Sequence, residues 1–144
     1  MASSPAGPDR PAASGWSAWG RLLRLPNLFT VPGDAVAGFL LVSGGAWHPG
    51  VAFAGCAVLF LYGGGLLLND YYDREEDARD RPSRPLPSGQ VRPRTVLFAG
   101  YAALCGGTAM AGLGGGIPGL LAGGILSLVI VAYDAGGKRC ACGP

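Results

Sequence analysis

Residues Leu66 to Gly89 read LLLNDYYDREEDARDRPSRPLPSG and place six carboxylates directly after an apolar run. Outward from this stretch, three long apolar runs carry no charge, at residues 51–68, 95–116 and 117–133. A fourth run, at residues 28–45, has Asp34 as its only charge. Each run approaches the ~20 residues that cross a bilayer as a helix, and barrel strands are far shorter. Only helices satisfy every backbone polar group within one segment in lipid. The sequence therefore predicts an all-α membrane protein with four transmembrane helices, at about 28–45, 51–69, 95–113 and 117–134.

The basic residues all fall on one side of these predicted spans. They precede the first span, lie between the second and third, or follow the fourth: Arg10, Arg21, Arg24, Arg74, Arg79, Arg81, Arg84, Arg92, Arg94, Lys138 and Arg139. Because cytoplasmic loops are enriched in Lys and Arg, we expect both termini and the acidic loop in the cytoplasm. We expect an integral protein of a bacterial cell membrane.

The N-terminal residues differ in composition from the rest of the chain. Residues 1–20 are rich in Pro, Ser and Ala and lack a long apolar run, so we predict a disordered cytoplasmic tail followed by a transmembrane domain over 21–144. The arginines elsewhere are interleaved with acids, and no soluble domain is predicted. These features exclude nucleic acid as a partner and leave membrane lipids as the surroundings of the chain.

The spacing of the acids predicts a ligand site. If the second predicted helix continues through them, Asn69, Asp73 and Asp77 are spaced four residues apart, and Asp70 lies three before Asp73. These four side chains would then share one helix face. Stacked carboxylates repel each other unless a cation lies between them. Oxygen ligands of this kind suit Mg²⁺, which uses one or two carboxylates plus a substrate phosphate.

A plainer interpretation of the same acids is a solvated mesh of ion pairs with Arg79, Arg81 and Arg84. Two observations favour the ligand site: the acids are regularly spaced and the arginines are not, and the cluster lies at the end of an apolar helix. For Asp34, inside the first predicted span, we expect a side chain that faces this site, because an unpaired carboxylate in a membrane is costly.

Three motifs, in this order, resemble the UbiA superfamily of intramembrane prenyltransferases. RLPNLFT, with Arg24 and Asn27, resembles the R-x-x-N element that precedes the first span of that family. NDYYDREED, from Asn69 to Asp77, resembles its first aspartate-rich motif, and RPSRPLPSG resembles the sequence that follows. YDAGGK, from Tyr133 to Lys138, resembles its Tyr and Lys element. The resemblance implies the N-terminal half of a nine-helix prenyltransferase fold.

The resemblance also implies a reaction. Family members bind an isoprenyl diphosphate through Mg²⁺, ionise its C–O bond and transfer the isoprenyl group to an acceptor, often aromatic or lipid-like. It implies metal ligands at Asp70, Asp73 and Asp77, and catalytic roles for Asp73, Asp77, Tyr133 and Lys138. It implies substrate-binding residues at Arg24, Asn27, Asn69, Asp70 and Arg84.

Two alternatives stay open at this point. The chain carries one aspartate-rich motif where the family has two, so it is expected to be a part of a longer enzyme or to pair with a second subunit. The alternative is a truncated, non-catalytic membrane protein that retains the diphosphate-binding motif. A CDP-alcohol phosphotransferase is disfavoured, because its D-G-x-x-A-R pattern does not occur here.

Overall fold

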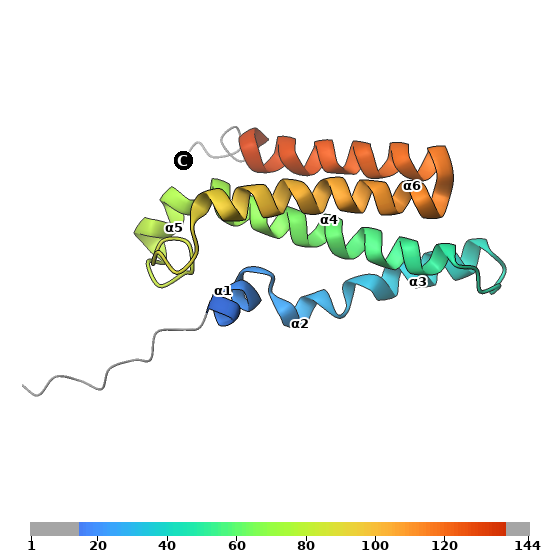
Figure 1. Ribbon diagram of the computed structural model, residues 1–144, viewed down its shortest axis with the longest axis horizontal. Helices are drawn as coiled ribbons and strands as arrows, with labels where there is room; N and C mark the ends of the chain where they lie inside the picture. Colours follow the sequence, from blue (N-terminus) through green and yellow to red (C-terminus); the bar gives the residue numbers. More distant parts are fainter. Residues whose placement is uncertain (1–14, 138–144) are drawn as a thin grey trace, which may run out of the picture.

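The computed structural model describes residues 15–137 and shows a helical bundle packed around one long central helix (Figure 1). In chain order the elements are α1 (Gly15–Leu22), α2 (Leu25–Leu28), α3 (Val31–Val42), α4 (Gly50–Tyr72), α5 (Arg74–Asp80), α6 (Pro93–Ala132) and the π-helical turn η1 (Tyr133–Gly137). The described residues contain no strand. The predicted all-α class is therefore confirmed.

Three helices are long and apolar enough to cross a membrane. They are Leu25–Val42, Gly50–Tyr72 and Pro93–Gly136. The first two correspond to the predicted spans 28–45 and 51–69. The predicted spans 95–113 and 117–134 form the single element α6, so the count of four spans is not confirmed.

Helix α6 reverses direction near its middle (Figure 1). Gly116 has φ 62° and ψ −148°, which lies outside the helical region and is open to glycine because it has no Cβ. Pro118 follows, and its fixed φ suits the start of the second limb. The Thr108 and Ser127 hydroxyl oxygens lie 2.9 Å apart across the two limbs. Two antiparallel limbs therefore replace one continuous rod.

Small residues let α4 and α6 approach closely. A Cβ on Gly107 would lie 2.7 Å from Leu61 Cγ, and one on Gly64 would lie 2.9 Å from Leu104 Cδ2. Packing of small residues against large ones is how helices associate in lipid, where the hydrophobic effect between them is absent. These contacts hold α4 beside α6 and fix the position of its polar end.

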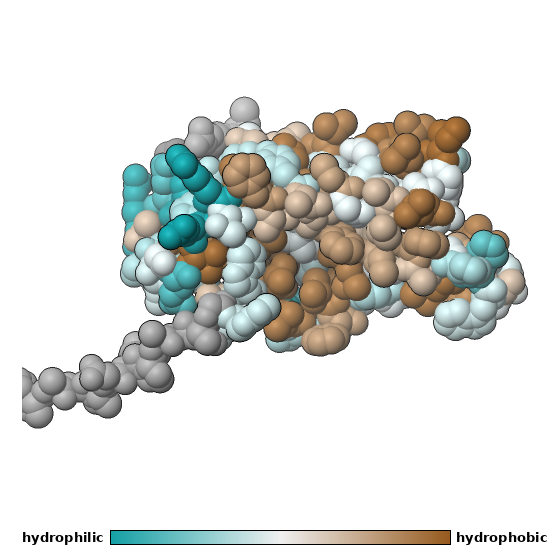
Figure 2. Space-filling view, viewed as in Figure 1, coloured by the Kyte–Doolittle hydropathy of each residue, from teal (hydrophilic) through white to brown (hydrophobic). Residues whose placement is uncertain are grey.

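The polar end of the bundle lies around α5, with the apolar surface gathered over the long helices (Figure 2). Helix α1 packs here, because Ala18 and Leu22 are buried in a cluster with Leu86 and Val91. Residues 15–20, which the sequence predicts to be part of a disordered tail, are helical in the structure. The burial of one apolar face of this short helix is the reason.

Candidate functional site

The acids of the opening stretch lie where α4 passes into α5. Helix α4 ends at Tyr72 and α5 begins at Arg74, and Asp73 between them has φ −83° and ψ 0°. Asp70 and Asp77 are only 8% and 7% exposed. A helix break at this position changes the directions in which the later acids point.

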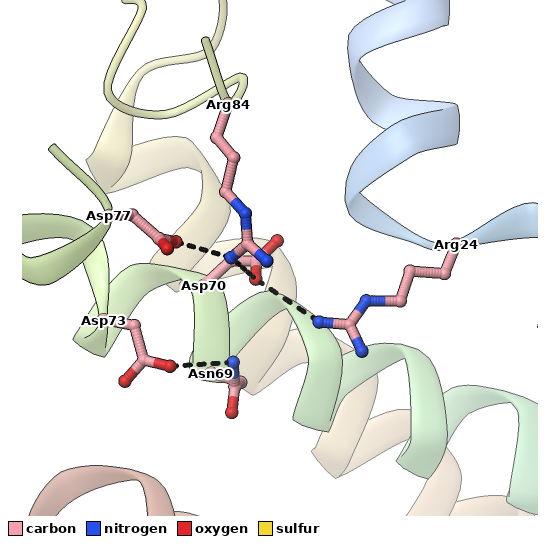
Figure 3. Close-up of polar contacts among 6 residues, drawn as sticks. All are labelled: Arg24, Asn69, Asp70, Asp73, Asp77 and Arg84. Carbon is pink, nitrogen blue, oxygen red and sulfur yellow. Dashed lines mark hydrogen bonds and ion pairs between the residues drawn. The ribbon is translucent and has the colours of Figure 1, made fainter. Parts of the chain in front are cut away.

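One guanidinium joins two of the buried acids (Figure 3). Arg84 Nη1 donates to Asp77 Oδ2 at 2.6 Å and lies 3.4 Å from Asp70 Oδ1. Arg84 comes from the segment after α5, so three separate parts of the chain meet at this point. We call Asp70, Asp77 and Arg84 the acid cluster. Its two carboxylates reach the same nitrogen and therefore lie close enough to share a cation.

Asn69 and Asp73 form a second pair beside the acid cluster (Figure 3). Asn69 Nδ2 donates to Asp73 Oδ2 at 3.0 Å. The expectation that all four residues of the motif share one face is therefore corrected to two pairs, Asn69 with Asp73 and Asp70 with Asp77. The helix break at Asp73 and the ion pairs of Arg84 with Asp70 and Asp77 explain the difference.

The oxygen atoms of the acid cluster meet part of what a hard divalent cation requires of its ligands. The residues from 15 to 137 contain no group of three His, Cys, Asp or Glu side chains arranged to hold a metal ion. Asp70 and Asp77 nevertheless supply two convergent carboxylates, and Mg²⁺ commonly takes one or two carboxylates together with substrate phosphates and water. The chemistry of this pair suits Mg²⁺, whereas Asp73 is directed to Asn69. The magnesium site stays a prediction.

Arg24 approaches the acid cluster from the other side. Its Nη2 atom lies 4.0 Å from Asp70 Oδ1. Its backbone has φ 47° and ψ 53°, and it is the only non-glycine residue of the described chain with positive φ. Such strain is retained at sites where the surrounding structure fixes it. Two arginines therefore balance the two buried acids.

One apolar cavity adjoins this site, and a second lies further along α4. The first, the mouth cavity, has a volume of about 370 Å³ and is lined by Arg24, Leu61, Tyr62, Gly65, Leu66, Asn69, Val129, Ile130, Tyr133 and Asp134. The second, the deep cavity, has a volume of about 300 Å³ and is lined by Phe39, Gly50, Ala54, Ala57, Val58, Leu61, Ala111, Gly114, Gly115, Gly119, Ala122, Gly123 and Leu126. Leu61 belongs to both. Along α4, the lining of the two cavities extends from Asn69 to Gly50. At 1.5 Å per residue these two residues lie about 28 Å apart, which is close to the thickness of a hydrocarbon core.

Of the remaining residues predicted to belong to the site, some line its cavities and others do not. Tyr133 lines the mouth cavity and is 60% exposed. Asn27 is exposed in α2, and Asp34 is exposed in the first turn of α3. Within the described part of the chain, no hydrogen bond or ion pair joins the side chain of either residue to the acid cluster. Lys138 lies outside the described residues.

Two residues near the site, Asp134 and Arg21, were not predicted from the sequence. Asp134 is buried and lines the mouth cavity with Asn69, and a carboxylate at the end of an apolar run was a signal for it. Arg21 lines a further cavity beside Arg84. Nothing local to its sequence indicated this, because the contact depends on how α1 packs.

Comparisons with known proteins agree on one family. A model described as the UbiA prenyltransferase family matches residues 33–143 of this chain. A digeranylgeranylglyceryl phosphate synthase of Methanothrix thermoacetophila is 44% identical over 84 residues, which cover 58% of this chain and 30% of that protein. The synthase of the same name from Methanopyrus kandleri is 40% identical over 84 residues, covering 58% and 29%. No solved structure matches.

These alignments cover less than a third of the length of either relative. The family match extends over most of this chain and includes Asn69, Asp70, Asp73, Asp77 and Arg84. It begins after Arg24 and Asn27. With three apolar helices and this match, the chain is an integral membrane protein and belongs to the UbiA prenyltransferase family.

Proposed function

We propose that this chain binds an isoprenyl diphosphate and contributes to the transfer of its isoprenyl group to an acceptor in the membrane. The observation that carries the proposal is that the polar residues of the motif lie at the opening of the apolar mouth cavity. Asn69 lines the mouth cavity and donates to Asp73, and Asp70 and Asp77 lie next to it. A diphosphate at the acids would have its apolar tail directed along α4, within the two cavities.

The chemistry that this geometry supports is cleavage of the C–O bond between the isoprenyl group and the diphosphate. The electron pair leaves with the diphosphate oxygen, a hydroxyl oxygen of the acceptor forms the new C–O bond, and its proton departs with the diphosphate. Arg24 and Arg84 place positive charge where the leaving group gains negative charge, in surroundings from which water is partly excluded. Asp70 and Asp77 are the residues that would hold Mg²⁺, which supplies further charge neutralisation at the phosphate oxygens when bound.

The acceptor we favour is a lipid with a glyceryl phosphate headgroup. The support is the name shared by the relatives, digeranylgeranylglyceryl phosphate synthase, which describes a glyceryl phosphate bearing two geranylgeranyl groups. Addition of the second group would require a glyceryl phosphate that carries the first. This choice narrows the aromatic or lipid-like acceptor that the family resemblance alone suggested.

The experiment that tests the proposal is binding of geranylgeranyl diphosphate to the purified chain in phosphatidylcholine nanodiscs. We expect saturable binding with Mg²⁺ and at least about tenfold weaker binding with EDTA, because metal ions bridge carboxylates and phosphates. Geranylgeraniol, which lacks the diphosphate, serves as the control and should not compete. Equal binding with Mg²⁺ and EDTA would contradict the metal site, and absence of binding would favour the non-catalytic alternative.

We also propose that each limb of α6 crosses the membrane, giving four crossings with the acid cluster on the cytoplasmic side. The arginines at one end and the uncharged turn at Gly116 support this arrangement. In a background with all four cysteines replaced by serine, Glu76→Cys should be labelled from the cytoplasm. Trp47→Cys and Gly115→Cys should be labelled from the opposite side. Labelling of Gly115→Cys from the cytoplasm would contradict the fourth crossing.

A further inference from the structure

A polar cavity distinct from the mouth cavity is lined in part by Asp70 and Arg84 of the acid cluster. It has a volume of about 280 Å³ and is lined by Arg21, Arg24, Asp70, Ser83, Arg84 and Pro85. We call it the arginine cavity. It shares Arg24 with the mouth cavity, but Arg21, Ser83 and Pro85 have no part in the proposed binding of the donor. Its lining therefore needs an explanation of its own.

The charge of the arginine cavity points to an anion. Three of its lining side chains are guanidinium groups and one is a carboxylate. Arg84 is also bonded to Asp77, which takes up part of its charge, and Arg24 lies at the 4.0 Å limit of an ion pair with Asp70. Arg21 makes no ion pair with a described residue, so the cavity keeps an excess of positive charge. Guanidinium groups in a fork geometry suit phosphate oxygens, and the Ser83 hydroxyl adds a further donor.

The walls of the cavity are fixed to each other. The α1 wall rests on Ala18 and Leu22, which are buried against Leu86 of the opposite wall. Arg21 also donates a hydrogen bond to Gln90 Oε1, which joins α1 to the segment that carries Ser83 and Arg84. A cavity held from both sides keeps its charges in place without a ligand, which lowers the cost of ordering them on binding.

The surroundings of the cavity indicate a lipid ligand. Trp16, Leu25 and Phe29 flank Arg21 and Arg24 along the chain and are 87%, 43% and 83% exposed. Large apolar side chains beside arginines are typical of a segment that lies in the bilayer interface. A phosphate attached to an apolar chain could reach this cavity with its chain still in the membrane, whereas free phosphate would gain nothing from these apolar neighbours.

We propose that the arginine cavity binds the phosphate monoester of the acceptor, a glyceryl phosphate lipid that carries one isoprenyl ether. The inference rests on the proposed function. A reaction between two phosphate-bearing lipids requires two anion sites, and Arg21 and Ser83 supply polar groups that the proposed donor site does not use. Arg24 borders both the mouth cavity and the arginine cavity. The donor diphosphate occupies the Asp77 side of the acid cluster, and the acceptor phosphate occupies the Arg21 side of the arginine cavity. Asp70 and Arg84 border both sites.

The test replaces Ser83, which has no hydrogen bond to Asp70 or Asp77 among the described residues. Ser83→Glu adds a carboxylate to the cavity, and Ser83→Gln adds the same bulk without the charge. We measure binding of geranylgeranylglyceryl phosphate and of geranylgeranyl diphosphate with Mg²⁺ in phosphatidylcholine nanodiscs. Ser83→Glu should weaken binding of the glyceryl phosphate at least about tenfold, the loss expected when a charge-assisted hydrogen bond is removed. It should change diphosphate binding less than about twofold. Ser83→Gln, whose amide N–H can replace the hydroxyl as a hydrogen-bond donor, should change the binding of each ligand less than about twofold.

A second pair of variants separates a binding role of Arg21 from its structural contact. Arg21→Ala removes the guanidinium and the bond to Gln90, whereas Gln90→Ala removes that bond and the bond from Gln90 Nε2 to Ser88 Oγ but keeps the guanidinium. We expect Arg21→Ala to weaken binding of the glyceryl phosphate and Gln90→Ala to leave it within about twofold of the parent. Arg94→Ala, at an exposed arginine outside the cavity, controls for the loss of one positive charge.

The outcomes distinguish this inference from the proposed function. If Ser83→Glu weakens both ligands equally, the cavity belongs to the donor site and the inference is overturned while the proposed function stands. If inorganic phosphate or phosphatidylglycerol competes as well as the glyceryl phosphate, the site is a general anion or lipid contact and the inference is overturned. If the parent binds the glyceryl phosphate with the expected dependence on Ser83 but no diphosphate, the inference stands and the proposed function fails.

Discussion

Replacing Asp77 by asparagine is expected to weaken Mg²⁺-dependent binding of geranylgeranyl diphosphate at least about a hundredfold, since loss even of an outer-shell partner costs a metal site about 10- to 100-fold. The substitution keeps the size of the side chain but removes one of the two carboxylates that reach Arg84 Nη1. It also shifts the local charge towards positive, which disfavours a cation. Isothermal titration of the ligand in the presence of Mg²⁺ measures the effect.

Glu76→Gln provides the matched control for this experiment. Glu76 is the neighbouring residue on α5, it is exposed, and its replacement makes the same change in charge. We expect it to bind within about twofold of the parent, because an exposed charge is screened by water and salt. The midpoint of thermal unfolding, measured for both variants, shows whether Asp77→Asn remains folded. A folded Asp77→Asn that binds like the parent would disprove the assignment of the acid cluster.

Replacing Ala122 by leucine is expected to make the chain discriminate between donors by length. Ala122 lines the deep cavity, about 17 Å from Tyr133 along the second limb of α6 at 1.5 Å per residue. A leucine there fills space that the far end of a geranylgeranyl tail would occupy, and overfilling of a packed space is unfavourable. Binding of geranylgeranyl diphosphate should weaken about tenfold or more, while that of geranyl diphosphate, with half the isoprene units, should change less than about twofold.

Ala109→Leu is the matched control for the length prediction. Ala109 is exposed on the first limb of α6 and does not line either apolar cavity, so the same substitution there adds bulk outside the groove. Competition between the two diphosphates, measured on both variants, gives the ratio of their affinities. A parallel loss for both diphosphates in Ala122→Leu would show that the tail does not follow α4.

The helices of this chain were predictable because their signal is local. Long uncharged runs place α4 within three residues of the predicted span, and the positions of Gly116 and Pro118 mark the reversal of α6. Two features of the fold were less accessible. The helix α1 is too short for its burial to be evident from composition, and the four predicted spans appear as three long elements because the reversal at Gly116 interrupts α6 for a single residue.

The candidate site was predictable in its members and not in its geometry. The motif identified Asn69, Asp70, Asp73 and Asp77, because their residue types and spacing are visible in the sequence. Their division into two pairs depends on Arg84, which arrives 14 residues after Asp70. A helical wheel assumes a continuous helix and takes no account of a residue from another segment, such as Arg84. Contacts between distant segments therefore set which carboxylates converge.

The backbone of Arg24 places stability and ligand binding in opposition at a single residue. Its left-handed conformation costs a non-glycine residue roughly 1–2 kcal/mol. A glycine at this position would relieve that cost, but it would also remove the guanidinium that borders both the mouth cavity and the arginine cavity. Selection for a stable fold alone would favour the glycine. The arginine thus gives up that stability and places a positive charge at the border of both cavities.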